Sequence, residues 1–174
     1  LLGDPMETAL VEMARAAIAP AGNYERINEI PFDADRKRMS LLYRMPEGVK
    51  LYCKGAPETV LPLCSRMDVN GRSEALDRQH LELLRQAQEA MAEEGLRVLA
   101  LAYRHLPSGC EQGSWEQELT LCGLVGLEDP PRPEVPAAIA RCRAAGIKVI
   151  MVTGDHPHTA LAIGRQIGQI QSEA

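Results

Sequence analysis

The chain has 174 residues, of which 45% are hydrophobic and 25% are charged, a balance typical of a folded globular protein. Its 24 acidic residues outnumber its 19 lysines and arginines, and the net charge of −5 argues against nucleic-acid binding through bulk positive charge. The longest apolar runs, at 121–127 and 147–152, are far shorter than the roughly 20 residues that cross a bilayer as a helix.

The first part of the chain predicts a helix followed by three strands. Asp4 is a good N-cap and Pro5 suits the first helical position, and apolar residues then recur at helical spacing until about residue 20. Strands are expected at 24–32, 39–45 and 49–53, the last two joined as a hairpin by the turn at 45–48. A short helix is expected from Pro57 to about Cys64.

The middle of the chain predicts a turn, a long helix and two strands before a proline-rich connector. The turn lies at 68–71, the amphipathic helix at 74–94 with Gly95 as its stop, and the strands at 97–104 and 119–127. Three prolines within 130–133 cannot continue a helix or a central strand. We therefore expect a domain boundary there, with one domain at 1–128 and the start of a second at 129–174.

The last part of the chain reads as half of a doubly wound α/β domain. Helices are expected at 134–145 and 157–167, on either side of a continuous apolar run at 147–152 that suits a strand buried on both faces. Such domains bind ligands at the carboxyl ends of their strands, where Thr153, Gly154 and Asp155 follow. Because the rest of that sheet is not in the sequence, we expect the strand to pair with 121–127, to pair with another copy, or to be poorly ordered.

Two stretches have the residue types that hold a nucleotide. Phe32 is the only phenylalanine, and Arg36, Lys37 and Arg38 follow it closely. An aromatic ring beside cations suits a planar base carrying phosphates, since stacking contributes about 1–3 kcal/mol per base. The pattern by itself favours a plainer interpretation, a core phenylalanine followed by a solvated turn.

The second stretch is Lys54-Gly55 at a strand end, where glycine permits close approach of a ligand and lysine supplies a point charge. A tight turn with an exposed lysine explains it equally well. Glu7 is either the capping-box partner of Asp4 or an acceptor for an exocyclic amine such as that of adenine. Asp155 is either the N-cap of the last helix or, with Thr153 and Gly154, part of a phosphoryl-binding turn.

Metal and disulfide chemistry are not indicated. The five cysteines are widely spaced with no C-x-x-C pair, and the four histidines are scattered, so we expect free thiols in a reducing cytosol and no metal site. The chain begins at Leu1 without an initiator methionine or a signal peptide, which we interpret as a piece of a longer protein.

Six motifs, taken in order, resemble the P-type ATPases, and most closely the calcium-transporting and related type II cation pumps. They are G-D-P-M-E-T-A-L at 3–10, F-D-A-D-R-K-R-M-S at 32–40, K-G-A-P-E at 54–58, G-L-R-V-L-A at 95–100, D-P-P-R at 129–132 and M-V-T-G-D at 151–155. The resemblance covers nearly the whole chain. It implies an α/β (α+β) fold, with an antiparallel sheet flanked by helices as the nucleotide-binding domain and a partial Rossmann-like, haloacid-dehalogenase-type segment after it.

The resemblance also implies a role for each candidate residue. Phe32 would stack on adenine, Lys54 and Gly55 would line the pocket floor, and Glu7 would meet the adenine side. Lys37 would lie beside the base and the phosphates, and Arg97 would reach toward the phosphates. The hinge between domains would consist of Asp129, Pro130, Pro131 and Arg132. Thr153, Gly154 and Asp155 would support the transferring phosphoryl group and Mg²⁺. The partners implied are ATP and the phosphorylation, actuator and membrane domains of the same polypeptide, with this part on the cytoplasmic side.

Two departures from the family pattern limit what the chain can do by itself. Ala34 stands where some relatives carry an arginine near the phosphates, and the D-K-T-G-T and G-D-G-x-N-D segments are absent from the sequence. An aspartyl phosphate needs its nucleophile, so we expect this chain to bind nucleotide without hydrolysing it. The alternatives are a haloacid-dehalogenase-type phosphatase, for which Asp33-Ala34-Asp35 has the shape of a nucleophile pair, and a nonenzymatic ATP-binding module.

Overall fold

The structure is a computed structural model that describes residues 5–17, 24–128, 131–153 and 157–170. The chain separates into two compact units, one of Leu1–Leu81 with Leu99–Leu127, the other of Glu82–Val98 with Glu128–Ala174. Because the second unit includes part of a helix and strand that precede residue 128, the predicted division into 1–128 and 129–174 remains a prediction. Each unit is considered by itself below.

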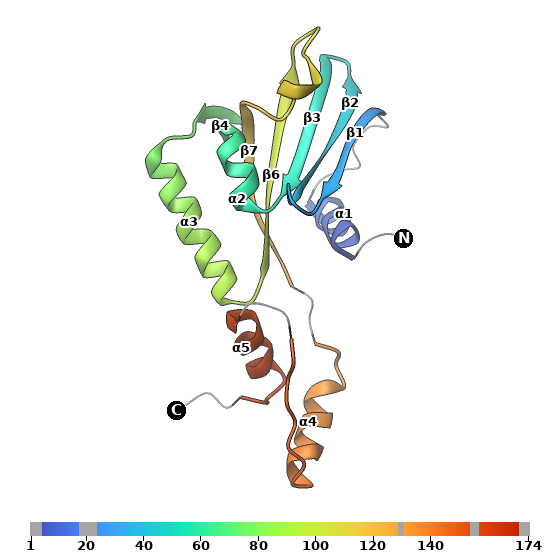
Figure 1. The fold of residues 1–174 in the computed structure, drawn as a ribbon, viewed down its shortest axis with the longest axis vertical. Helices are drawn as coiled ribbons and strands as arrows, with labels where there is room; N and C mark the ends of the chain where they lie inside the picture. Colours follow the sequence, from blue (N-terminus) through green and yellow to red (C-terminus); the bar gives the residue numbers. More distant parts are fainter. Residues whose placement is uncertain (1–4, 18–23, 129–130, 154–156, 171–174) are drawn as a thin grey trace. The chain divides into compact units, whose positions relative to one another are not determined.

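A seven-stranded mixed sheet dominates the first unit (Figure 1). The strands lie in the order β1-β2-β3-β6-β7-β4-β5. Their bounds are β1 Glu25–Asp33, β2 Arg38–Met45, β3 Gly48–Gly55, β4 Cys64–Val69, β5 Arg72–Ala75, β6 Arg97–Leu106 and β7 Leu119–Leu127. The helices are α1 Pro5–Ala17, α2 Pro57–Val60, α3 Arg78–Glu93, α4 Val135–Ala144 and α5 Pro157–Gln166, with 3₁₀ turns η1 Leu61–Leu63 and η2 Gln112–Ser114.

The predicted hairpin is confirmed. β2 and β3 pair antiparallel in continuous register from Arg38 opposite Gly55 to Met45 opposite Gly48. Gly48 has a φ of 127°, a conformation that favours glycine. The packed interior of this unit includes Leu42, Leu51, Val60, Leu119 and Leu121, all nearly inaccessible to solvent. Burial of each such side chain contributes about 1.5–3 kcal/mol to the free energy of unfolding. These residues are therefore a main source of the stability of this unit.

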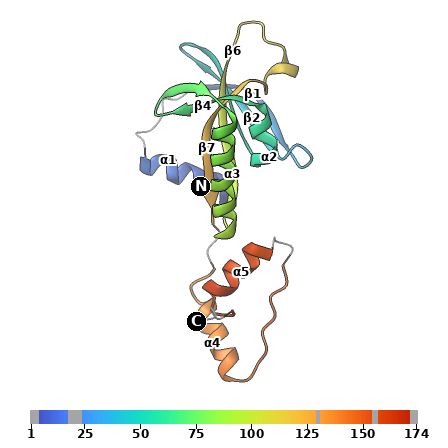
Figure 2. The ribbon, with the colours of Figure 1, turned by 90° about the vertical axis from the view of Figure 1, so that its left-hand side faces the viewer.

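The helices α1 and α2 lie on opposite sides of this sheet (Figure 2). Successive side chains of a strand point to opposite faces, so Met39 and Leu41 share one face of β2 while Arg38, Ser40 and Leu42 share the other. The residues of the first set line a groove with α1. We call the face of Met39 and Leu41 the groove face and the face of Arg38, Ser40 and Leu42 the buried face.

Two strands of the sheet were not expected from the sequence. β4 and β5 form a hairpin around Asn70 and Gly71, whose φ values of 53° and 80° suit a tight two-residue turn. The predicted sheet was antiparallel, whereas β4 pairs parallel with β7. The helix expected from residue 74 starts later, at Arg78, because Asp77 Oδ1 accepts the backbone N–H of His80 at 2.9 Å and so caps it.

The predicted strand at 147–152 is wrong. These residues form neither a helix nor a strand, and Ile150 and Val152 are 70% and 91% exposed. Of the three placements expected for this run, pairing with 121–127 does not form, because β7 already has β6 on one side and β4 on the other. Pairing with another copy stays a prediction. An apolar run forms a strand only where a neighbouring strand supplies partners for its backbone hydrogen bonds. The helices α4 and α5 are present as predicted, but the Rossmann-like segment is not confirmed.

Among the described residues, no helix is both long enough and apolar enough to cross a membrane.

Candidate functional site

A groove of about 350 Å³ lies in the first unit between α1 and the sheet. This volume is at the lower end of the range of small-ligand sites. Most of its lining is apolar and comes from five elements, α1, β2, β3, β6 and β7. The lining residues are Glu7, Leu10, Met13 and Ala14 of α1, Met39 and Leu41 of β2, Tyr52, Cys53 and Lys54 of β3, Leu101 and Ala102 of β6, and Cys122 of β7.

Lys54 and Glu7 form an ion pair at this groove. The Nζ atom of Lys54 donates a hydrogen bond to Oε1 of Glu7, which joins β3 to α1 across 47 residues of sequence. The side chain of Lys54 is largely buried, whereas that of Glu7 is half exposed. The structure therefore brings two of the predicted site residues together. They give the apolar groove one amine and one carboxylate, groups that can bind the polar edge of a flat ring. The capping alternative for Glu7 involves Asp4, which lies outside the described residues.

Phe32 is not a core residue. It is 63% exposed, which removes the plainer interpretation of the sequence. The β1–β2 register moves from Ile30 opposite Ser40 to Asp33 opposite Arg38, so Pro31 and Phe32 together face Met39 in a bulge. Proline cannot donate a hydrogen bond to the sheet, which accounts for the irregularity at this point.

The sheet register places Phe32 and Lys54 in one row. Met39 of β2 lies opposite Lys54 of β3, and the bulge at Phe32 lies on the other side of Met39. Neighbouring strands are about 4.8 Å apart, so the backbones of Phe32 and Lys54 are separated by roughly 10 Å. That is about the length of a nucleoside, although Phe32 does not itself line the groove.

The turn between β1 and β2 is held by several local contacts. Asp33 Oδ1 accepts the N–H groups of Asp35 at 3.0 Å and of Arg36 at 2.9 Å. Lys37 has a φ of 50°, uncommon for a residue other than glycine, and its Nζ lies 3.2 Å from Oε1 of Glu58. Asp33 is thus engaged in a turn at the edge of the sheet, an arrangement unlike the buried strand end that the phosphatase alternative requires.

Gly55 is required for packing against this turn. A Cβ placed on Gly55 would lie 2.4 Å from Cβ of Arg38 and 2.6 Å from the carbonyl oxygen of Lys37. The N–H of the next residue, Ala56, donates to that same carbonyl at 3.0 Å. The small size of Gly55 therefore lets β3 approach the Lys37 turn, whereas its predicted contact with a ligand remains a prediction.

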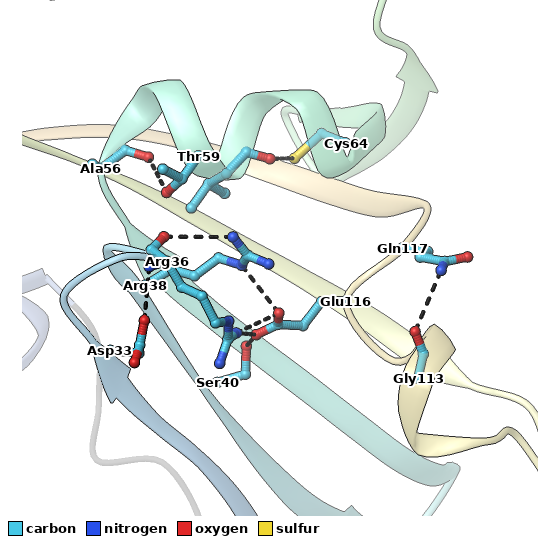
Figure 3. Close-up of polar contacts among 11 residues, drawn as sticks. Asp33, Arg36, Arg38, Ser40, Ala56, Thr59, Cys64, Gly113, Glu116 and Gln117 are labelled. Atoms are coloured by element: carbon cyan, nitrogen blue, oxygen red, sulfur yellow. Dashed lines mark hydrogen bonds and ion pairs between the residues drawn. The ribbon is translucent and has the colours of Figure 1, made fainter.

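Glu116 accepts hydrogen bonds from three residues on the buried side of the sheet (Figure 3). It was not identified as a candidate from the sequence. Its carboxylate accepts hydrogen bonds from Arg36 Nη2 at 2.6 and 2.5 Å, from Arg38 Nε at 3.0 Å and from Ser40 Oγ at 2.7 Å. Burial raises the pKa of this carboxyl, but the hydrogen bonds from Ser40, Arg36 and Arg38 together lower it by more than burial raises it. The net pKa therefore lies below the ordinary glutamate value. The only sequence signal was the run of basic residues at 36–38, which lies 78 or more residues away.

The other predicted site residues belong to the second unit or lie outside the described residues. Arg97 is exposed at the start of β6 and falls in the second unit. Arg132 is exposed, and its carbonyl accepts the N–H of Val135 at 2.9 Å before α4. Pro131 is partly buried and Thr153 is exposed. Asp129, Pro130, Gly154 and Asp155 lie outside the described residues.

The described part of the chain holds no cluster of three or more His, Cys, Asp or Glu side chains arranged for a metal ion. Its five cysteines are free. Burial raises the pKa of the Cys53 thiol, and it raises that of Cys64 to about 12. These two thiols are therefore poor nucleophiles at neutral pH.

The sequence model of a family described as "P-type ATPase, cytoplasmic domain N" matches residues 1–134. Calcium-transporting ATPase 1 of Bacillus cereus is 40% identical over 172 residues, which cover 95% of this chain and 19% of that protein. A plasma membrane-type calcium-transporting ATPase 10 of Oryza sativa is 40% identical over 97% of this chain, and the sodium/potassium-transporting ATPase subunit alpha-4 of Rattus norvegicus is 38% identical over 99%. The chain spans about a fifth of the length of these relatives.

Proposed function

The chain belongs to the P-type ATPase family, and from this membership we propose that it is the ATP-binding cytoplasmic part of a cation-transporting pump of the calcium type. ATP would bind in the first unit. Its γ-phosphate would be transferred to an aspartate outside this sequence, and hydrolysis of that aspartyl phosphate would be coupled to ion movement across a membrane.

The observation that carries this proposal is the apolar groove with the Lys54–Glu7 pair on its lining. An adenine ring needs apolar faces and a few polar groups at its edge, and the groove offers both. The exposed ring of Phe32, in the same row of the sheet, can stack on a base held beside Lys54. Lys37, at the adjoining turn, supplies a cation for the phosphates.

The remaining predicted residues would act after ATP has bound. In the transfer step, the bond between the γ-phosphorus and the ADP oxygen breaks while an aspartate oxygen bonds to that phosphorus. Catalysis of such a step is mostly positioning, and Mg²⁺ bound with the nucleotide would neutralise the developing charge. Thr153, Gly154 and Asp155 would support the phosphoryl group, Arg97 would reach the phosphates, and the segment from Asp129 to Arg132 would let the two domains swing together.

Titration calorimetry with a non-hydrolysable ATP analogue tests the proposal on the 174-residue chain. We expect saturable binding that weakens roughly 10- to 100-fold in Phe32→Ala, which is the stacking range of about 1–3 kcal/mol. Lys54→Ala should weaken binding by a similar factor, since a hydrogen bond from a charged group contributes about 1.5–3 kcal/mol.

Matched controls separate these contacts from general effects of truncation. Tyr24→Ala removes another exposed aromatic ring, and Lys148→Ala removes another exposed lysine, yet neither residue lines the groove. Both variants should bind like the parent chain. Absence of saturable binding by the parent chain would refute the proposal, and unchanged affinity in Phe32→Ala would remove Phe32 from the site.

A further inference from the structure

We infer that Glu116 is a positioning residue of the nucleotide site: from the buried face of the sheet it fixes the β1–β2 turn between Phe32 and Lys37. This inference rests on the proposed function, because it concerns residues that would contact ATP. Glu116 itself lies among protein groups and does not line the groove.

The first support is that both oxygens of the Glu116 carboxylate accept hydrogen bonds. Its side chain is only 13% exposed, and each oxygen accepts two hydrogen bonds. Oε1 is shared by Arg36 and Ser40, and Oε2 by Arg36 and Arg38. Ser40 is fully buried, and Glu116 accepts a hydrogen bond from its hydroxyl. A single carboxylate from the segment before β7 thus joins three positions on the turn and the first residues of β2.

The second support is the face on which the contacts lie. Side chains alternate along β2, so Arg38 and Ser40 point to the buried face and Met39, between them, points to the groove face. Glu116 therefore holds the backbone from behind at the point where Phe32 faces Met39 on the neighbouring strand. A change at Glu116 would move Phe32 and Lys37 without removing any group that lines the groove.

The third support is electrostatic. Arg36, Lys37 and Arg38 are consecutive cations on a tight turn, and the two guanidinium groups are mostly buried. Without Glu116 these two charges would be left with little compensation, and they would have to move toward solvent. Since Lys37 has a positive φ, the turn has little freedom to absorb that movement without changing its shape.

The test compares binding of the ATP analogue by the parent chain, Glu116→Gln, Glu116→Asp and the control Glu118→Gln. Glu118 lies two residues further on and pairs with Arg104, but its side chain is 75% exposed and does not touch the turn. We expect Glu116→Gln to weaken binding roughly 10-fold, the size of coupling found between residues of one network, and Glu116→Asp to restore part of that loss. Glu118→Gln should leave the affinity unchanged.

A double-variant cycle distinguishes positioning from loss of stability. If Glu116 acts through the turn, adding Glu116→Gln to a chain that already carries Phe32→Ala and Lys37→Ala should weaken binding much less than it does in the parent chain. Urea denaturation of each variant gives the folded fraction, and Glu116→Asp replaces Glu116→Gln in the cycle if the latter does not fold.

The outcomes separate the two proposals. Failure of the parent chain to bind the analogue would overturn the proposed function and this inference together. Normal binding by the parent chain with equal affinity in folded Glu116→Gln would overturn the inference alone. Tighter binding by Glu116→Gln would also overturn it, because it would mean that released arginines, and not an ordered turn, determine the affinity for phosphate.

Discussion

Replacing Gly55 by alanine would test directly how closely β3 approaches the Lys37 turn. The added Cβ would lie 2.4 Å from Cβ of Arg38, 2.7 Å from its Cα and 2.6 Å from the carbonyl oxygen of Lys37. Non-bonded carbon atoms are most stable at about 3.5–4.0 Å, so the overlap is at least about 1 Å. Two of these three atoms belong to the backbone, and rotation of a side chain cannot relieve the contact.

We expect Gly55→Ala to lower the free energy of unfolding by about 3 kcal/mol, the upper part of the range for overpacked cores. For a chain of this length that corresponds to a fall in melting temperature of roughly 6–12 °C. Urea denaturation followed by circular dichroism measures the change. The matched control is Gly113→Ala, since a Cβ there meets nothing within 4 Å, and it should change the stability by less than about 0.5 kcal/mol. Equal stability of the two variants would refute the close approach.

Two further predictions concern titrating groups. The thiol of Cys64 is partly buried and its pKa is raised to about 12, so it should resist iodoacetamide at neutral pH in the folded chain and react in urea. Mass spectrometry of the alkylated peptides measures this, and rapid reaction in the folded chain would contradict the raised pKa. The lowered pKa of Glu116 means that its stabilising contribution is complete above the ordinary glutamate value of 4.5 and is lost as the pH falls through the lower folded value. The stability advantage of the parent chain over Glu116→Gln should therefore shrink on acidification below about pH 4.5, and an advantage in urea midpoint that does not depend on pH would exclude this linkage.

Elements with local signals could be predicted from the sequence. The turn around Gly48 and the glycine after α3, Gly95, both have positive φ values and end regular structure where expected. The hairpin at Asn70 and Gly71 was missed although its turn was recognised, because β5 is short and fully exposed and so has no apolar alternation. The parallel contact of β4 with β7 depends on a pairing across more than 50 residues, which no local pattern encodes.

The apolar run at 147–152 shows a different limit. Its composition is that of a buried strand, yet burial also requires neighbours, and β7 has no free edge to offer. The candidate site, likewise, was only partly predictable from the sequence. Lys54 and Glu7 were identified by residue type and do meet, whereas Glu116 is one of many glutamates and acquires its importance only from the fold.

The run of three cations after Phe32 is therefore not a uniform attractor for phosphate. Arg36 and Arg38 share the single carboxylate of Glu116 at 2.5–3.0 Å, in surroundings where an unpaired charge is costly. Within the described part of the chain, the ion-pair partner of Lys37 is Glu58, and the two side chains are 56% and 55% exposed. Exposed pairs of this kind contribute about 0–1 kcal/mol, so a phosphate could replace Glu58 at little cost. Among the contacts that the structure describes, Lys37 is thus the cation that can most easily follow a ligand, and Arg36 and Arg38 hold the turn that carries it.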